Sequence, residues 1–314
     1  MKILKYLSGL SLALGLAISA TSAMAQWAPN GSLTIEVGFA PGGSTDTMGR
    51  VIAQVIEENT GWNVIVENRP GAGGVAMFTR LSQLPADGQI VGLGVSAPFL
   101  TQLVARPETL PFNLDSFEYL ASITRAQVAL VASKNAPFDD LAGMVAKSKE
   151  EGIAIAFGSD AQKKVMEYIA ANTGANFRYV ATKGAAETLP LILGGQVLAG
   201  FATGEHVQYL QTGDMKMIMS LNNARHDYAP GVETILEAGQ DIFLDPIIFL
   251  ATTAGLPNDA KEALQKAFDD AMASDKVKEI VRNASQSEAI NIGPKELRTQ
   301  MDAGMASMKK LLGK

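Results

Sequence analysis

The sequence predicts an α/β protein of two domains, each built on a mostly parallel sheet flanked by helices. Strands and helices alternate along the chain with glycine turns between them, and this order favours parallel sheets. The chain has 314 residues, 47% of them apolar, which is enough for two hydrophobic cores. Disorder is not a reasonable alternative for such a composition.

Apolar spacing places the individual elements. An alternating strand at 33–39 precedes a helix with apolar residues at helical spacing between Met48 and Ile56. Pro257 and Pro294 mark the starts of two helices near the carboxyl end. We expect further strands at 64–66, 90–95, 128–132, 153–157, 177–180, 197–202, 215–219 and 243–251, and a helix at 75–84.

No segment rich in Pro, Gly and Ser divides the chain. Two domains without a linker are often interleaved, so the chain is expected to cross between them more than once. The extended, apolar segments 118–125 and 244–249 are candidate crossings. The predicted domain I is therefore discontinuous (26–124 and 247–314), and domain II is 125–246.

Residues 1–25 have the features of a secretory signal peptide. Lys2 and Lys5 precede an apolar run at 7–18, and Ala23-Met24-Ala25 forms a small-x-small cleavage pattern. An uncleaved anchor is the alternative, but the run is short for a span of ~20 residues. We expect cleavage after Ala25 and a soluble periplasmic protein. Without cysteine there is no lipid attachment and no disulfide.

Charge and residue content disfavour several functions. The precursor has 26 basic and 32 acidic residues, a net charge of −6, which makes nucleic acid an improbable partner. There is no thiol nucleophile, no G-x-S-x-G elbow, and no metal-binding spacing at His206 and His226. We therefore expect no catalytic residue, metal or cofactor, although missing motifs do not exclude an enzyme.

The most informative segment is the strand–turn–helix junction at 33–46. A Pro-Gly-Gly turn at 41–43 follows the strand, and Ser-Thr-Asp at 44–46 begins a helix. Glycines allow backbone angles closed to other residues and leave N–H groups uncovered. The helix start adds unpaired N–H groups and the positive end of its dipole. This junction is expected to bind an anion.

A carboxylate would be held by the amides from Gly43 to Asp46 and by a hydroxyl of Ser44 or Thr45. Charge-assisted bonds of this kind contribute about 1.5–3 kcal/mol each. Alternatively, Ser44 caps the helix and Asp46 stabilises its first turn. Both functions can coexist. Asp46 is expected to be structural, because a carboxylate would repel an anion.

Other strand ends supply further candidates. The loop at 68–74 lacks the glycine spacing of a dinucleotide fingerprint and is either a packing turn or a ligand contact. Ser96 and Ser159 follow strands at matching points of the two domains. Lys183 lies between a strand and a helix and is a stronger candidate than Lys163 and Lys164, which fit a solvated helix surface.

Taken together, FAPGGSTD (39–46) and VENRPGAGG (66–74) resemble the periplasmic solute-binding proteins of tripartite tricarboxylate transporters, also called Bug receptors. PADG at 85–88, Lys183-Gly184 and GGQV at 194–197 extend the resemblance over nearly all of the mature chain. It implies a type II-like clam shell: two α/β domains joined by crossing strands, which close on a small carboxylate.

The resemblance also implies the ligand contacts. The corresponding positions are Phe39, Gly43, Ser44, Thr45 and Ser96 in the first domain, and Ser159, Lys183, Gly184 and Ala185 in the second. The implied partners are a small carboxylate and membrane permease subunits, and a monomer is expected. A periplasmic sensor that signals to another protein and, less favoured, a secreted enzyme with an anionic substrate are the alternatives.

The chain departs from the family pattern in the middle domain. The loop at 157–164 is shortened, and Lys163 and Lys164 stand near the usual histidine positions. Thr182 replaces a common tyrosine and Leu198 a common acid. The contacts to the ligand carboxylate would then be kept, while the specificity for the rest of the ligand would differ from that of other family members. The added lysines suggest a second carboxylate on the ligand, whose identity stays open.

Overall fold

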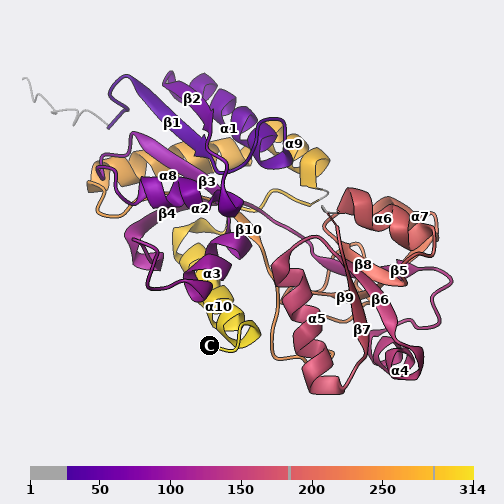
Figure 1. Ribbon diagram of the computed structural model, residues 1–314. Coiled ribbons are helices and arrows are strands. Elements are labelled where there is room, and N and C mark those ends of the chain that lie inside the picture. Colours follow the sequence, from indigo (N-terminus) through magenta and orange to yellow (C-terminus); the bar gives the residue numbers. More distant parts are fainter. Residues whose placement is uncertain (1–26, 183–184, 286) are drawn as a thin grey trace, which may run out of the picture.

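The computed structural model describes residues 27–182, 185–285 and 287–314 and forms two lobes (Figure 1). Each lobe contains a five-stranded sheet flanked by helices, so the α/β class with two sheets is confirmed. The predicted signal peptide, Lys183 and Gly184 lie outside the described residues. Within the described ranges, no helix is long and apolar enough to cross a membrane.

The sheet of the first lobe has the order β2-β1-β3-β10-β4. Its strands are β1 (Ser32–Val37), β2 (Asn63–Asn68), β3 (Ile90–Val95), β4 (Phe117–Arg125) and β10 (Ile247–Thr253). β1 pairs in parallel with β2 and β3, whereas β10 is antiparallel to β3 and β4. Four strands therefore share one direction and only β10 opposes them.

The sheet of the second lobe repeats this pattern in the order β7-β6-β8-β5-β9. Its strands are β5 (Ala129–Ser133), β6 (Ile153–Phe157), β7 (Phe177–Ala181), β8 (Ala199–Ala202) and β9 (Met215–Ser220). β6 is parallel to β7 and β8, and β5 is antiparallel to β8 and β9. In both lobes the opposed strand is the one that the chain enters directly after crossing.

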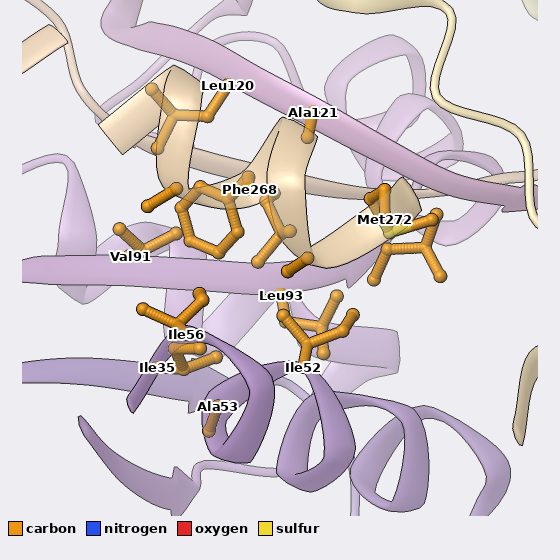
Figure 2. Close-up of a cluster of buried hydrophobic side chains, with 14 of the residues drawn as sticks. Ile35, Ile52, Ala53, Ile56, Val91, Leu93, Leu120, Ala121, Phe268 and Met272 are labelled. Carbon is orange, nitrogen blue, oxygen red and sulfur yellow. The ribbon is translucent and has the colours of Figure 1, made fainter. Parts of the chain in front are cut away.

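Helices cover both faces of the first sheet. One face carries α1 (Ser44–Thr60), α8 (Asn258–Ala273) and α9 (Asp275–Ser285). The other carries α2 (Val75–Leu81), α3 (Ser96–Ala105) and α10 (Gly293–Leu311). Figure 2 shows Ile52 and Ile56 of α1 and Phe268 of α8 packed against Leu93 of β3. Full burial of each such side chain contributes about 1.5–3 kcal/mol.

The second lobe is covered in the same way. Its helices are α4 (Leu141–Glu151), α5 (Asp160–Thr173), α6 (Ala185–Leu193) and the short α7 (Val207–Gln211). Met144 of α4 and Ile169 of α5 are fully buried in one cluster. Leu189 and Ile192 of α6 lie in another. Short 3-10 turns, η1 (Ala72–Gly74) and η2 (Leu114–Ser116), complete the first lobe.

The chain passes between the lobes from β4 to β5 and from β9 to β10, and the two passages are bonded to each other. The Ala126 N–H donates to the Pro246 carbonyl at 2.8 Å. Asn222 Nδ2 donates to the Ala126 carbonyl (2.9 Å) and to Asp245 Oδ1 (2.7 Å). Arg125 lies 3.2 Å from Asp245. The strand expected at 243–251 begins only at Ile247, because the preceding residues form this crossing.

The carboxyl-terminal helix contacts both lobes. Leu297 and Met301 of α10 belong to a cluster of the first lobe, whereas Met308 and Leu311 are buried in the core of the second. Ser307 Oγ also bonds to both backbone groups of Phe243. The last turns of α10 therefore pack between the lobes, and the assignment of 247–314 to domain I stays a prediction.

Candidate functional site

Loops from three neighbouring parallel strands of the first lobe meet at one edge of the sheet. A Cβ on Gly38 would lie 2.6 Å from the Cα of Gly74, and one on Gly73 would lie 2.5 Å from the Cβ of Pro98. The loops after β1, β2 and β3 therefore touch, and only glycine fits at these contacts. Ligands of open α/β sheets bind outside the carboxyl ends of the strands, which is this edge.

The start of α1 lies within this edge. Its N-cap, Gly43, makes no side-chain cap, and Ser44 is exposed while Thr45 is buried. The first helical N–H groups therefore have neither a partner within the helix nor a capping side chain. This start can accept an anion.

The two glycines before α1 have different conformations, which corrects the sequence argument. Gly42 has φ +80°, a left-handed angle that favours glycine. Gly43 has φ −77° and ψ 168°, extended backbone that any residue adopts. A Cβ on Gly43 would meet only the Ala40 carbonyl, at 3.6 Å. A protein with a larger residue at position 43 would therefore still fold, but the new side chain would lie beside the N–H groups at the start of α1.

Asp46 joins the loops together, as its structural role predicts. Its carboxylate accepts from the Gly42 N–H (2.8 Å) and Asn68 Nδ2 (2.8 Å), and Arg50 pairs with it at 2.9 Å. Burial raises the pKa of Asp46, but the bonds from Arg50, Gly42 and Asn68 outweigh it and keep the pKa below its ordinary value. Asn68 Nδ2 also donates to the Phe39 carbonyl at 3.0 Å.

The arginine of the 68–74 loop, Arg69, forms ion pairs within the protein. Arg69 Nε lies 2.6 Å from the fully buried Glu36, and its Nη2 lies 2.7 Å from Glu67. Arg80 contacts Glu36 as well. The loop at 68–74 thus holds the edge in place, and its arginine is already paired.

Ser96 is the first residue of α3 and is buried. Its Oγ accepts from the Ile247 N–H at 2.9 Å, which fixes the start of β10 beside the crossing. The hydroxyl hydrogen is still free to be donated. Ser96 therefore links the candidate edge to the segment on which the lobes would move.

In the second lobe, Ser159 is the exposed N-cap of α5. Its Oγ accepts from the Gln162 N–H at 3.4 Å, and Gln162 Oε1 accepts from the Gly158 N–H at 2.7 Å. The helix start in this lobe is thus covered by its own side chains, unlike the start of α1.

Lys163 and Lys164 are paired with one acid. Lys164 lies 2.6 Å and Lys163 3.4 Å from Glu167, and the Lys164 bond lowers the pKa of Glu167. Lys163 also lies 5.7 Å above the Tyr179 ring. Glu167 cancels one of the two positive charges and binds both ammonium groups, so part of the charge that suggested a second ligand carboxylate is already used within the helix.

The last sequence candidates follow β7. Lys183 and Gly184 lie outside the described residues, and Ala185 begins α6. Thr182 Oγ1 bonds to the Phe157 carbonyl (3.1 Å) and to Thr188 (2.8 Å), which ties this strand end to the loop after β6. In the first lobe the structure thus places Phe39, Gly43, Ser44, Thr45 and Ser96 at one edge of the sheet. In the second lobe Ser159 and Ala185 follow the carboxyl ends of β6 and β7.

Sequence reasoning missed the loop after β8. Thr203, Gly204, Glu205 and Gln208 line a hollow of about 280 Å³ together with Asn283, Ala284 and Ser285 at the end of α9. Both lobes thus contribute to it. The strand-end rule that selected Ser96 and Ser159 would have selected this loop, since 197–202 was expected to be a strand.

A buried chain of hydrogen bonds fixes this loop to the crossing. His206 Nε2 lies 2.8 Å from the Tyr228 hydroxyl, which lies 2.7 Å from His226 Nδ1. His226 Nε2 lies 2.8 Å from Asn222 Oδ1. Burial lowers the pKa of both histidines to about 4, so they are neutral at pH 7. The described residues contain no group of three or more acids and histidines that could hold a metal.

Comparison with known proteins identifies the family. The TctC family, described as the tripartite tricarboxylate transporter family receptor, matches residues 48–302. This chain belongs to that family. The matched region begins just after the 39–46 loop. BugT of Bordetella pertussis is 30% identical over 216 residues, which are 66% of this chain and 66% of BugT. The family is one of receptors, not of enzymes.

Solved structures share the fold of this TctC receptor. A TctC solute-binding protein from Polaromonas has a TM-score of 0.81 at 22% identity, covering 91% of this chain and 99% of its own. MatC from Rhodopseudomonas palustris, with bound malate, has a TM-score of 0.68 at 22% identity and covers 89% and 98%. These likenesses show the two-lobed solute-binding fold.

Proposed function

We propose that this TctC receptor is exported through a signal peptide cleaved after Ala25 and captures a small carboxylate between its lobes. It would deliver the ligand to the permease of a tripartite tricarboxylate-type transporter. The observation that carries the proposal is the uncapped start of α1 at the edge where three strand-end loops meet. Malate in the similarly folded MatC supports a carboxylate as the ligand.

The carboxylate would bind to the backbone N–H groups of Ser44 and Thr45, with a hydroxyl of Ser44 or Ser96 as a further donor. Bonds to a charged acceptor contribute about 1.5–3 kcal/mol each. No basic side chain is required, because the helix start supplies the positive potential. Asp46 would hold the loop and not the ligand, since both of its oxygens are already bonded.

Ser159, Lys183, Gly184 and Ala185 would contact the ligand from the second lobe. When the lobes close on it, water is excluded and each charged contact strengthens as the local dielectric falls. Closure also creates a surface that only the loaded receptor presents, which a permease can distinguish. The short passages at 126–128 and 245–246, which join β4 to β5 and the second lobe to β10, would act as the hinge between domains I and II.

The test replaces Gly43 by valine, which the backbone tolerates but which places a side chain beside the N–H groups. Gly231→Val is the matched control, because Gly231 lies in an open loop of the second lobe. A thermal-shift screen against a carboxylate library first finds a ligand, since a ligand that binds only the folded state raises Tm. Calorimetry then measures affinity for both variants.

We expect Gly43→Val to keep the Tm of the ligand-free protein and to lose affinity by about 100-fold or more, the equivalent of two charged hydrogen bonds. Gly231→Val should bind like the parent. If Gly43→Val binds as tightly as the parent, the carboxylate does not bind at this helix start and the proposal fails.

A further inference from the structure

The hollow between the loop at 203–208 and the end of α9 has a chemistry different from that of the α1 edge. Its lining residues are polar or small, and Glu205 is the only charged residue among those described. Glu205 is exposed, and its carboxylate accepts two long hydrogen bonds, both of 3.3 Å, from the N–H and the hydroxyl of Thr203. It has no ion-pair partner within the described part of the chain. The hollow therefore carries negative charge.

The opposite wall adds to this negative potential. Asn283, Ala284 and Ser285 end α9, where the helix dipole has its negative end. The Ser285 carbonyl accepts from Ser287 Oγ at 3.2 Å. Arg282 in the same turn is directed to Glu288, 3.7 Å away, and does not line the hollow. In Figure 1 this end of α9 points toward α6 and α7 of the second lobe.

Helix packing places this negative end near the positive start of α1. Lys276, at the beginning of α9, pairs with Glu58 near the end of α1 at 2.7 Å. Val277 and Val281, which follow Lys276 along α9, pack in the same core as α1, so α9 runs back along α1 in the opposite direction. The end of α9 lies about nine residues beyond this pair, whereas Ser44 lies about 14 residues from it along α1. Measured along the helix axes, the end of α9 therefore stops about five residues, or ~7 Å, before the level of Ser44. A positive and a negative helix end thus lie on one side of the lobe.

The backbone at Glu205 is held in a fixed position. Gly204 before it has φ +137°, an angle that L side chains rarely adopt, and His206 after it is fully buried. The chain through Tyr228 and His226 anchors His206 to Asn222, which bonds both passages between the lobes. A carboxylate on such a loop is preorganised for a ligand and loses little entropy on binding.

We propose that the ligand carries an ammonium group, which enters the hollow beside Glu205 while its carboxylate occupies the start of α1. This inference rests on the proposed function and narrows the ligand class to amino-carboxylates whose two charges are several bonds apart. A dicarboxylate would place its second negative charge against Glu205 and the end of α9. Lys163 and Lys164 do not line the hollow, and both ammonium groups are held by Glu167.

The experiment uses unbranched ligands of three to seven carbons in three forms: the monocarboxylate, the α,ω-dicarboxylate and the ω-amino-carboxylate. Calorimetry measures each with the parent protein, with Glu205→Gln and with Glu262→Gln. Glu262 is an exposed acid of α8 outside the hollow, so its variant removes the same charge elsewhere. We expect the parent to prefer the amino-carboxylate of the best length by at least about tenfold.

Glu205→Gln should reduce that preference to about twofold or less, and Glu262→Gln should leave it unchanged. The inference is overturned if dicarboxylates or monocarboxylates bind as well as amino-carboxylates, or if Glu205→Gln keeps the preference; the proposed function survives either result. If no carboxylate of the series or of a wider library binds the parent, the proposed function itself is rejected.

Discussion

The two lobes share a sheet topology but present their strand-end loops differently. In the first lobe, side chains such as Asp46 and Asn68 bond to the loops and leave the first N–H groups of α1 uncovered. In the second lobe, Ser159 and Gln162 cover the start of α5 with their own oxygen atoms. The start of α1 is therefore open to an anion without rearrangement, whereas the start of α5 must break internal bonds before its N–H groups can touch a ligand.

This difference suggests a division of labour. A preformed site binds without reorganisation, so the first lobe would determine that a carboxylate binds at all. The second lobe adds the loop of Glu205, which would determine which carboxylate is retained. The departures from the family pattern at Lys163, Lys164 and Thr182 all lie in this lobe.

The largest effect that the comparison predicts is that of Asp46→Ala. The change leaves the Gly42 N–H and Asn68 Nδ2 without their acceptor, which should lower the free energy of unfolding by about 2–4 kcal/mol. The loop at 39–43 should then lose its conformation, and carboxylate binding should be lost. Urea unfolding and calorimetry measure the two quantities. A variant that keeps both full stability and affinity would contradict a preformed site.

Acidification should distinguish the lobes. His206 and His226 have pKa values near 4 when folded, below the ordinary value of ~6.5, so the unfolded chain binds more protons between these values and stability falls as the pH decreases through this window. The pKa of Asp46 in the folded protein is below its ordinary value. The stability that this carboxylate contributes is therefore lost only at lower pH, as the pH falls through that lowered pKa. The second lobe should therefore weaken first.

Hydrogen exchange, corrected for intrinsic rates, measures the second lobe, and fluorescence measures the first, because both tryptophans, Trp27 and Trp62, pack on its core. We expect protection around His206 and Tyr228 to decrease between pH 6.5 and 4 while the fluorescence stays constant. If the fluorescence of the first lobe changed together with the exchange protection of the second, the histidines would not act on the second lobe alone.

The smallest effect concerns Gln162→Ala. The change frees the Gly158 N–H, so a ligand no longer competes with a side chain, and affinity should rise a few-fold while stability falls by about 1 kcal/mol or less. Gln54→Ala, which removes an exposed contact on α1, is the matched control. A tenfold fall in affinity would instead indicate that Gln162 contacts the ligand.

Local pattern was sufficient for much of the fold. The strand at 153–157 and the helix start after Pro257 agree with the structure, because a short apolar run and a proline at a helix start are local signals. Strand direction is not local: β5 and β10 oppose their neighbours because they follow crossings. The contact of α10 with both lobes depends on the same distant packing.

The candidate site was predicted in part. The helix start after Pro-Gly-Gly and the structural role of Asp46 follow from residue types. The sequence left open that Ser44 caps the helix, whereas in the structure Gly43 is the N-cap and Gly42 has the left-handed angle. Pairing of Lys163 and Lys164 with Glu167 could have been inferred, since three- and four-residue spacings place these side chains together on a helix. The loop of Glu205 carries no glycine-rich or basic signal.

A crystal structure of the receptor with its tightest carboxylate tests the central claim most directly. We predict a carboxylate oxygen within ~2.7–3.1 Å of the backbone nitrogen of Ser44 or Thr45. A ligand bound between the lobes with its carboxylate on other groups, and with the start of α1 in contact only with solvent, would contradict the account.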